Sequence, residues 1–130
     1  MLNAVGIGTD IESVSRFASI RSRNDRFLRT FLTPGEIDYC FSKESPAPHI
    51  ASRFAAKEAV IKALSGLSVH DASFKDIEIT NDEYGAPSVS VKFKKKMNIR
   101  VEVSLSHCED KAVAIALAAR HRSSSPGRKK

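Results

Sequence analysis

Cysteine is scarce in this chain, and long hydrophobic runs are absent. The two cysteines among the 130 residues, Cys40 and Cys108, are too few and too far apart for a disulfide framework or a zinc site. No apolar segment approaches the roughly 18 residues that a membrane-spanning helix requires, and the first residues do not resemble a signal peptide. We therefore expect a soluble, single-domain protein of the cytoplasm, with reduced thiols and no membrane span.

Acidic residues are missing from the C-terminal end, and this absence locates most of the net charge of +6. Residues 120–130 contain five basic side chains and no acidic one, so the first 119 residues hold 16 basic against 15 acidic side chains. The serines, proline and charges of this end are typical of a disordered segment. We predict a single domain over residues 1–119 and a basic, disordered tail over 120–130, with no nucleic-acid partner.

A second stretch is nearly free of acidic residues. Five arginines fall within fourteen residues that contain one acid, Asp25; they are Arg16, Arg21, Arg23, Arg26 and Arg29. Such a stretch is either a solvated basic face or a surface that receives an acidic partner.

The residue patterns predict a mixture of helices and strands. Thr33 and Glu36 have the spacing of a capping box, with Pro34 in the first helical position. The expected helices are 14–22, 25–31, 34–42 and 49–64, and the expected strands are 5–12, 76–80, 88–93, 101–107 and 112–119. The abundance of alanine leaves a helix open for the last of these segments. We expect hairpins at 76–93 and 101–119, and hence an α+β domain whose N-terminal strand and helices pack on a largely antiparallel sheet.

The segment 49–64 is a strong helix former that is apolar nearly all round, so we expect it in the interior. Glu58 and Lys62 are four residues apart and therefore lie on one face of that helix. A buried carboxylate and ammonium need partners, and a metal ion or a phosphate would serve.

The strand 5–12 carries Gly6, Gly8 and Asp10 on one face. The two glycines allow another backbone or a ligand to approach that face closely. Asp10 and Glu58 together supply two hard oxygen donors, which Mg²⁺ takes along with waters and a substrate phosphate. The alternative is that Asp10 ends a strand and Glu58 pairs with Lys62.

Several motifs occur together in the order and spacing of one family. They are Gly6-Ile7-Gly8-Thr9-Asp10-Ile11 with Arg16, Leu32-Thr33 with Glu36, Arg53-Phe54-Ala55-Ala56-Lys57-Glu58-Ala59 with Lys62-Ala63, Asn81-Asp82 with Gly85 and Pro87, and Ser104-Leu105-Ser106-His107. Over residues 4–119 the chain resembles the holo-acyl-carrier-protein synthases, the short, stand-alone group of 4′-phosphopantetheinyl transferases.

The resemblance implies the phosphopantetheinyl transferase fold and a Mg²⁺-dependent reaction. In that reaction the phosphopantetheine of coenzyme A passes to a serine of apo acyl carrier protein, adenosine 3′,5′-bisphosphate leaves, and the product serves fatty acid biosynthesis. It makes Asp10 and Glu58 the metal ligands and places Lys62 against the pyrophosphate. It does not choose the base that takes the serine proton, which is either a metal-bound water or a carboxylate such as Glu58.

The resemblance also implies further binding residues. His107, with Ser106, would lie near the 3′-phosphate of coenzyme A across a subunit boundary, in a homotrimer whose active sites lie between subunits. Arg53 and Lys57 would reach phosphates or serve as structural ion-pair partners. Arg16, Arg21 and Arg23 would dock the acidic carrier protein.

Two other functions are compatible with parts of the sequence. A Mg²⁺-dependent nuclease would use the acidic residues and Lys62, although nuclease lysines more often follow the acid by two residues on a strand. A non-catalytic nucleic-acid-binding module would use the tail and the arginines, and it would leave Asp10 and Glu58 without a task.

Overall fold

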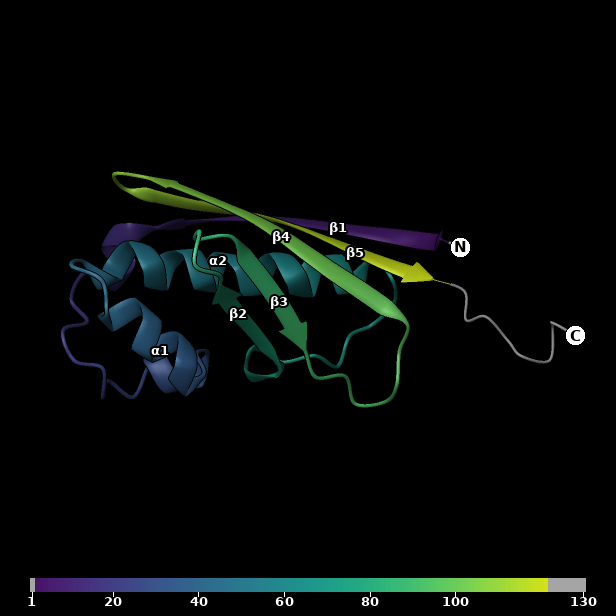
Figure 1. Cartoon of the computed structure of the whole chain (residues 1–130), viewed down its shortest axis with the longest axis horizontal. Coiled ribbons are helices and arrows are strands. Elements are labelled where there is room, and N and C mark those ends of the chain that lie inside the picture. The colour runs from purple at the N-terminus through teal and green to yellow at the C-terminus, as the bar shows by residue number, and fades with distance from the viewer. Residues whose placement is uncertain (1, 122–130) are drawn as a thin grey trace, which may run out of the picture.

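A computed structural model describes residues 2–121 as one α+β domain with two α-helices and five strands (Figure 1). In chain order these are β1 (Leu2–Ser13), α1 (Pro34–Phe41), α2 (Pro46–Ser65), β2 (Ile77–Asn81), β3 (Pro87–Val91), β4 (Ile99–Cys108) and β5 (Lys111–His121). Short 3₁₀ turns lie at Val14–Phe17, Leu28–Thr30 and Phe74–Asp76. None of the described helices is long and apolar enough to cross a membrane.

The strands form two antiparallel sheets. The larger has the order β1-β5-β4, and the smaller is the β2–β3 hairpin. Both expected hairpins are therefore confirmed, and the alanine-rich segment is a strand. In the larger sheet Asp10 pairs with Ala114, and His107 pairs with Ala112. Because β1 and β4 both lie at edges, these two side chains come from opposite margins of one sheet.

Helix α2 packs directly on the inner face of this sheet, where glycine and alanine leave room for it. A Cβ atom on Gly6 would lie 1.9 Å from the carbonyl oxygen of Ala63, and one on Gly8 would lie 2.0 Å from that of Ala59. The alanines of β5 that face the helix are fully buried, namely Ala112, Ala114, Ala116 and Ala118. The glycines of β1 were expected to allow a close approach of either another backbone or a ligand. The structure shows that a backbone, that of α2, lies against them.

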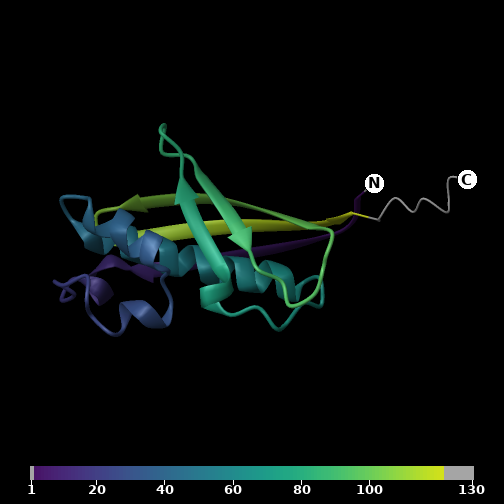
Figure 2. The ribbon, with the colours of Figure 1, turned by 60° about the horizontal axis from the view of Figure 1, so that its bottom comes forward.

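The opposite face of α2 is covered by α1 and the β2–β3 hairpin, as Figure 2 shows. Ile77 and Ile79 of β2 are buried in the same core cluster as Val60 and Leu64. Twelve of the twenty residues of α2 are buried. The helix is apolar nearly all round because protein covers it on both sides, which confirms its predicted interior position.

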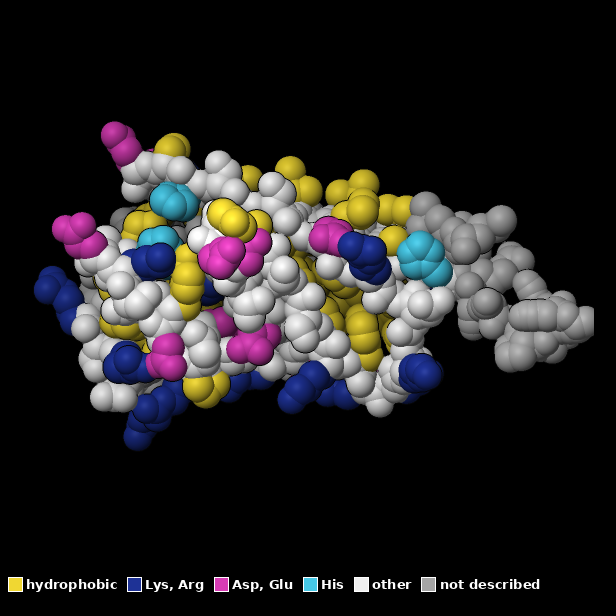
Figure 3. All heavy atoms as spheres, in the orientation of Figure 1, with side chains coloured by type: hydrophobic (Ala, Val, Ile, Leu, Met, Phe, Trp, Pro, Cys, Tyr) yellow, Lys and Arg dark blue, Asp and Glu magenta, His cyan; other side chains and the backbone are white. Residues whose placement is uncertain are grey.

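The outer face of the larger sheet is apolar and exposed. Its exposed side chains are Val5, Ile7, Ile11, Ile115 and Leu117, and Ile7 reaches 68% exposure. Figure 3 shows hydrophobic side chains along the upper rim, over these strands. Monomeric proteins seldom expose a contiguous apolar patch of this kind, and such patches often mark interfaces.

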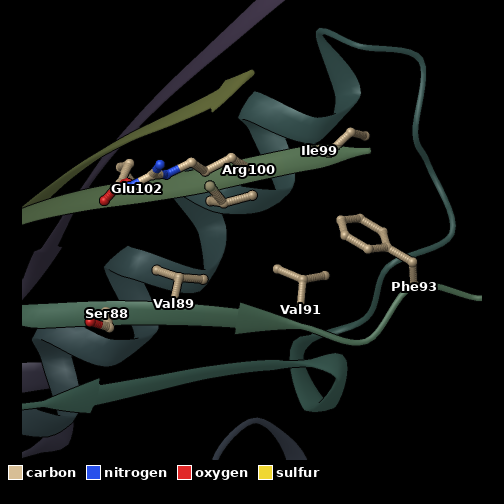
Figure 4. Close-up of a pocket in the computed structure, with 8 residues that line it drawn as sticks. Ser88, Val89, Val91, Phe93, Ile99, Arg100 and Glu102 are labelled. Carbon is tan, nitrogen blue, oxygen red and sulfur yellow. The ribbon is translucent and has the colours of Figure 1, made fainter. Parts of the chain in front are cut away.

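A groove of about 450 Å³ separates β3 from β4 (Figure 4). Val89, Val91, Phe93, Ile99 and Val101 give it an apolar lining. The two strands are therefore packed near each other without the hydrogen bonds that would join the two sheets.

The segment between β1 and α1 differs from expectation. Helices were expected over 14–22 and 25–31, but the structure has only the 3₁₀ turns Val14–Phe17 and Leu28–Thr30. The Ser22 hydroxyl accepts from the Asn24 N–H and the Asp25 carboxylate accepts from the Phe27 N–H, which favours turns over a helix. A buried cluster of aromatic rings that includes Phe17, Phe31 and Phe54 holds this segment on the helices.

The boundaries of α2 and β5 also differ from expectation. Helix α2 begins at Pro46, three residues before the expected start at 49, because proline is well tolerated in the first turn of a helix. Strand β5 extends through Arg120 and His121, which were assigned to the tail. Arg120 donates a hydrogen bond to the carbonyl of Leu67, and the His121 N–H donates to that of Asn98. Strand β5 therefore includes the first two residues of the predicted tail, and residues 122–130 lie outside the described part of the chain.

Candidate active site

Asp10 and Lys62 meet where β1 runs along α2. The Lys62 ammonium lies 3.6 Å from Oδ1 of Asp10 and donates a hydrogen bond of 3.0 Å to the carbonyl of Thr9. The side chain of Asp10 is 15% exposed, whereas that of Lys62 is 56% exposed. Lys62 therefore lies at the surface with its charge beside a largely covered carboxylate.

The second oxygen of Asp10, Oδ2, is buried and has no hydrogen-bond partner within residues 2–121. Glu58 lies on α2 next to Ala59, the residue whose carbonyl approaches Gly8 of β1. No ion pair in the described part of the chain joins Glu58 to Lys62, so the alternative pairing expected from their spacing is not formed.

The donors present, the carboxylates of Asp10 and Glu58, are of the chemical kind that a Mg²⁺ ion takes. An unpartnered buried carboxylate oxygen is costly unless it binds a cation. No cluster of three or more His, Cys, Asp or Glu side chains suited to a metal occurs within residues 2–121. Proteins nevertheless often supply only one or two carboxylate ligands to Mg²⁺, which completes its coordination shell with waters and substrate phosphates.

Glu12 is a third carboxylate near this site that the sequence analysis did not single out. Its side chain is 14% exposed, and its Oε1 accepts a hydrogen bond of 2.9 Å from Arg16. Burial raises the pKa of Glu12, and the neighbouring Asp10 carboxylate raises it further. Glu12 could have been identified from the sequence, because it lies two residues after Asp10 and therefore on the same face of β1.

Lys57 does not lie where a substrate phosphate could reach it. Its ammonium is fully buried and donates to Oε1 of Glu36 at 2.7 Å and to the carbonyls of Phe31 and Phe74 at 2.7 and 3.1 Å. All three N–H donors are thus used inside the core. The structure supports the role of structural ion-pair partner for Lys57. It contradicts the expected contact of Lys57 with coenzyme A.

Glu36 explains why that lysine is buried. Its Oε1 also accepts from the Thr33 N–H, and its Oε2 accepts from the Ile79 N–H at 2.6 Å. The predicted capping box of α1 is therefore present, and its glutamate also binds β2. This pair holds α1, α2 and β2 together.

Arg53 lies in a second site, a pocket of about 210 Å³ between α2, β2 and β4. Its lining consists of Tyr39, His49, Ser52, Arg53, Asn81, Gly85, Pro87, Leu105 and His107. The Arg53 guanidinium lies over the Tyr39 ring, 4.2 Å from its centroid, and donates one hydrogen bond to the side chain of Asn81. Its Nε is buried without a hydrogen-bond partner in the described residues. The pocket contains no carboxylate, so its charge favours an anion.

His107 lies in the same pocket as Arg53 of the same chain, but Ser106 does not. Neighbouring residues on a strand point to opposite faces, so Ser106 lies on the outer face of the sheet with Ile11 and Val113. Ser106 and His107 were both expected to bind coenzyme A, but within one chain they do not line the same pocket. Sequence reasoning missed Tyr39 and His49, which enter the pocket from α1 and the first turn of α2.

The three arginines expected to dock a carrier protein are all exposed. Arg16 pairs with Glu12 and lies over the ring of Phe54, with 4.6 Å between its guanidinium carbon and the centroid. Arg23 pairs with Asp38. Arg21 lies between them in the chain, in the segment after the first 3₁₀ turn.

Comparison with known proteins supports the same family as the motifs. The model of the 4′-phosphopantetheinyl transferase superfamily matches residues 6–118. The chain is 40% identical to a holo-[acyl-carrier-protein] synthase of Protochlamydia amoebophila, over 87% of this chain and 96% of that protein. It is 42% identical to the synthase of Thermodesulfovibrio yellowstonii, over 86% of this chain and 96% of that protein.

Solved structures with the same fold include proteins described as bound to coenzyme A. One is the synthase–coenzyme A complex of Chronobacterium ammoniagenes, with a TM-score of 0.77, 26% identity and coverage of 92% of this chain and 100% of that one. Another is the Bacillus anthracis synthase in complex with coenzyme A (3′,5′-ADP), with a TM-score of 0.73, 32% identity and coverage of 91% and 100%. The chain, with its phosphopantetheinyl transferase fold, belongs to the holo-[acyl-carrier-protein] synthases and is a phosphopantetheinyl transferase.

Proposed function

We propose that this enzyme transfers the 4′-phosphopantetheine of coenzyme A to a serine of an acidic apo acyl carrier protein, with Mg²⁺, in fatty acid biosynthesis. The observation that carries the proposal is the buried, unpartnered Oδ2 of Asp10, whose other oxygen lies 3.6 Å from the Lys62 ammonium. In the reaction the serine oxygen bonds to the phosphorus that carries pantetheine, the bond from that phosphorus to the bridging oxygen breaks, and adenosine 3′,5′-bisphosphate leaves.

Asp10 of β1 and the α2 residues Glu58 and Lys62 each have a role in this reaction. Asp10 and Glu58 would hold the metal ion, which would supply positive charge next to the pyrophosphate. Lys62 is half-exposed and places a second positive charge on the open side of the site, where the pyrophosphate lies. The serine proton passes to a carboxylate or to water.

The pocket around Arg53 takes the 3′-phosphate of coenzyme A. Arg53 has a buried Nε free to donate, and His107 adds a second donor at the exposed rim. A phosphate monoester would satisfy both groups by charge-assisted hydrogen bonds. The acidic carrier protein docks on Arg16, Arg21 and Arg23, beside the end of β1.

The active site is completed between subunits of a homotrimer. Asp10 lies on β1 and His107 on β4, the two edges of one sheet with β5 between them. A second copy placed against the first brings its β4 edge toward the β1 edge. The exposed apolar outer face, with Ile7 and Leu117, supplies a surface for such contact.

The direct test is to incubate the protein with coenzyme A, Mg²⁺ and an apo acyl carrier protein and to weigh the carrier. A gain equal to one phosphopantetheine is expected, and a chelator in place of Mg²⁺ should prevent it. An unchanged carrier mass would exclude the proposed transfer. The nuclease and nucleic-acid-binding alternatives have no observation at this site in their favour.

The metal role is tested by Asp10→Asn and Glu58→Gln. Each variant keeps the shape of its side chain and should stay folded, yet each should lose at least about a hundredfold in turnover because one charged ligand is gone. Circular dichroism and the carrier-mass assay measure the two properties. Near-normal turnover in either variant would exclude that residue as a metal ligand.

A further inference from the structure

The pocket around Arg53 contains a residue to which no role has yet been given, His49. It lies in the first turn of α2, four residues before Arg53, so both side chains lie on one face of the helix. The His49 ring is half-buried between two other rings. Its centroid lies 5.9 Å from that of Tyr39 and 5.9 Å from that of His107, with interplanar angles of 77° and 70°.

We propose that His49 is a further ligand of the 3′-phosphate of coenzyme A and that it gains a proton when the phosphate binds. The proposal rests on the function proposed above. It makes His49 a specificity-determining residue, because it acts only on the group that distinguishes coenzyme A from dephospho-coenzyme A.

The charges around His49 are all of one sign. Arg53 faces it from α2, Lys43 from the segment after α1, and His107 from β4, while Tyr39 of α1 contributes a neutral ring. Figure 3 shows two histidine side chains next to each other near the β4–β5 turn, with a basic side chain beside them. Burial lowers the pKa of His49, and these positive neighbours lower it further. These contributions therefore favour the neutral form of His49.

A bound phosphate reverses this balance. Its negative charge neutralises Arg53 and favours the charged form of a nearby imidazole, so the pKa of His49 rises on binding. The proton comes from the solvent and leaves with the phosphate. The preference for coenzyme A over dephospho-coenzyme A should therefore increase as the pH falls from about 8 to 6, the range in which histidine titrates.

Calorimetry tests this linkage directly. Binding of coenzyme A and of dephospho-coenzyme A is measured in two buffers of different ionisation enthalpy, so that proton uptake is obtained along with affinity. The phosphate of the coenzyme titrates alike with every variant. The difference in proton uptake between variants therefore reports the protons bound by groups of the protein.

His49→Gln should bind coenzyme A roughly tenfold more weakly at pH 6.5, lose much of the proton uptake, and bind dephospho-coenzyme A as the parent does. His70→Gln is the matched control, since His70 is exposed and lies near Ser65 at the far end of α2. It should match the parent in all three measurements.

Each outcome decides one question. If His49→Gln takes up protons and binds coenzyme A like the parent, the role of His49 is overturned while the proposed function stands. If the parent binds neither ligand, the proposed function fails and the role of His49 fails with it. An equal loss of affinity for both ligands would show that His49 only supports the fold of the pocket, and this would also overturn the proposal.

Discussion

Two buried cations on α2 show that the role of a charged side chain depends on its hydrogen-bond partners. Lys57 has three acceptors in the core, whereas Arg53 has a buried Nε with none in the described residues. A satisfied buried charge serves the structure, and an unsatisfied one indicates a ligand. The two residues are only four apart, so their spacing could not distinguish these roles.

Removing the Lys57 ammonium should strongly destabilise the fold. Lys57→Met leaves the Glu36 carboxylate buried without its cation, which typically costs about 3–5 kcal/mol. Lys94→Met is the control, because Lys94 pairs with Asp76 at the surface and should cost less than about 1 kcal/mol. Urea unfolding measures both variants. Equal effects would mean that the core pair contributes no more than a surface pair.

Cys40 should make stability fall in alkaline solution. Burial raises the pKa of its thiol to about 11, so above about pH 9 the thiol of the unfolded chain ionises while that of the folded chain does not. The stabilising difference is complete below pH 9 and is lost as the pH rises toward 11. The loss amounts to about 1.4 kcal/mol per pH unit.

Comparison of variants isolates this contribution from other groups that titrate at high pH. In Cys40→Ala, the free energy of unfolding should fall less between pH 9 and 11 than in the parent. Cys108→Ala should match the parent, because Cys108 is exposed. Parallel curves for the parent and Cys40→Ala would contradict the prediction.

At the scale of elements, the site depends on how closely β1 approaches α2. The backbones touch at Gly6 and Gly8, and this contact brings Asp10 of β1 to Lys62 of α2. Alanines on β5 extend the same flat surface under the helix. Small residues in these two strands therefore set how Asp10 and Lys62 lie relative to each other.

Gly8→Ala should separate these elements. Its Cβ would lie 2.0 Å from the Ala59 carbonyl oxygen, so backbone must move, and a loss of about 3 kcal/mol or more is expected. Turnover should fall along with stability, because Asp10 moves away from α2. Gly35→Ala is the control, since its Cβ meets only the flexible end of Glu78 at 3.2 Å. A stable, active Gly8→Ala would refute the close-approach argument.

At the scale of the molecule, the proposed active site is divided into two halves that lie at opposite edges of the sheet of one chain. The half at β1 contains Asp10 and the half at β4 contains the pocket of Arg53 and His107. In a closed ring of identical subunits each edge would meet the other edge of a neighbour.

Mixing two inactive variants tests this arrangement. Asp10→Asn lacks the metal half and Arg53→Ala lacks the phosphate half, so each alone should be nearly inactive. When the two are co-expressed in equal amounts, roughly a quarter of the interfaces in a closed ring would combine two intact halves. Turnover should rise to about that fraction of the parent value. Turnover no higher than the mean of the two variants alone would show that each site lies within one chain.

Much of the fold followed from local patterns. The capping box at Thr33 and Glu36, the period-two alternation of β4 and the apolar helix α2 all depend on residues near one another in the chain. The segment after β1 did not follow, because aromatic packing and short polar turns outweigh its helix propensity. Helix propensity is a weak preference that tertiary contacts override.

The sequence by itself determined the family and the α+β class, and it predicted Asp10, Glu58 and Lys62 as site residues, since these depend on residue types at set spacings. Only the tertiary structure decided that Lys62 pairs with Asp10, that Lys57 belongs to the core, and that His49 joins Arg53 and His107 in one pocket. The reason is physical. Burial and the choice of partner depend on which distant segments pack together, and a pattern along the chain does not contain that information.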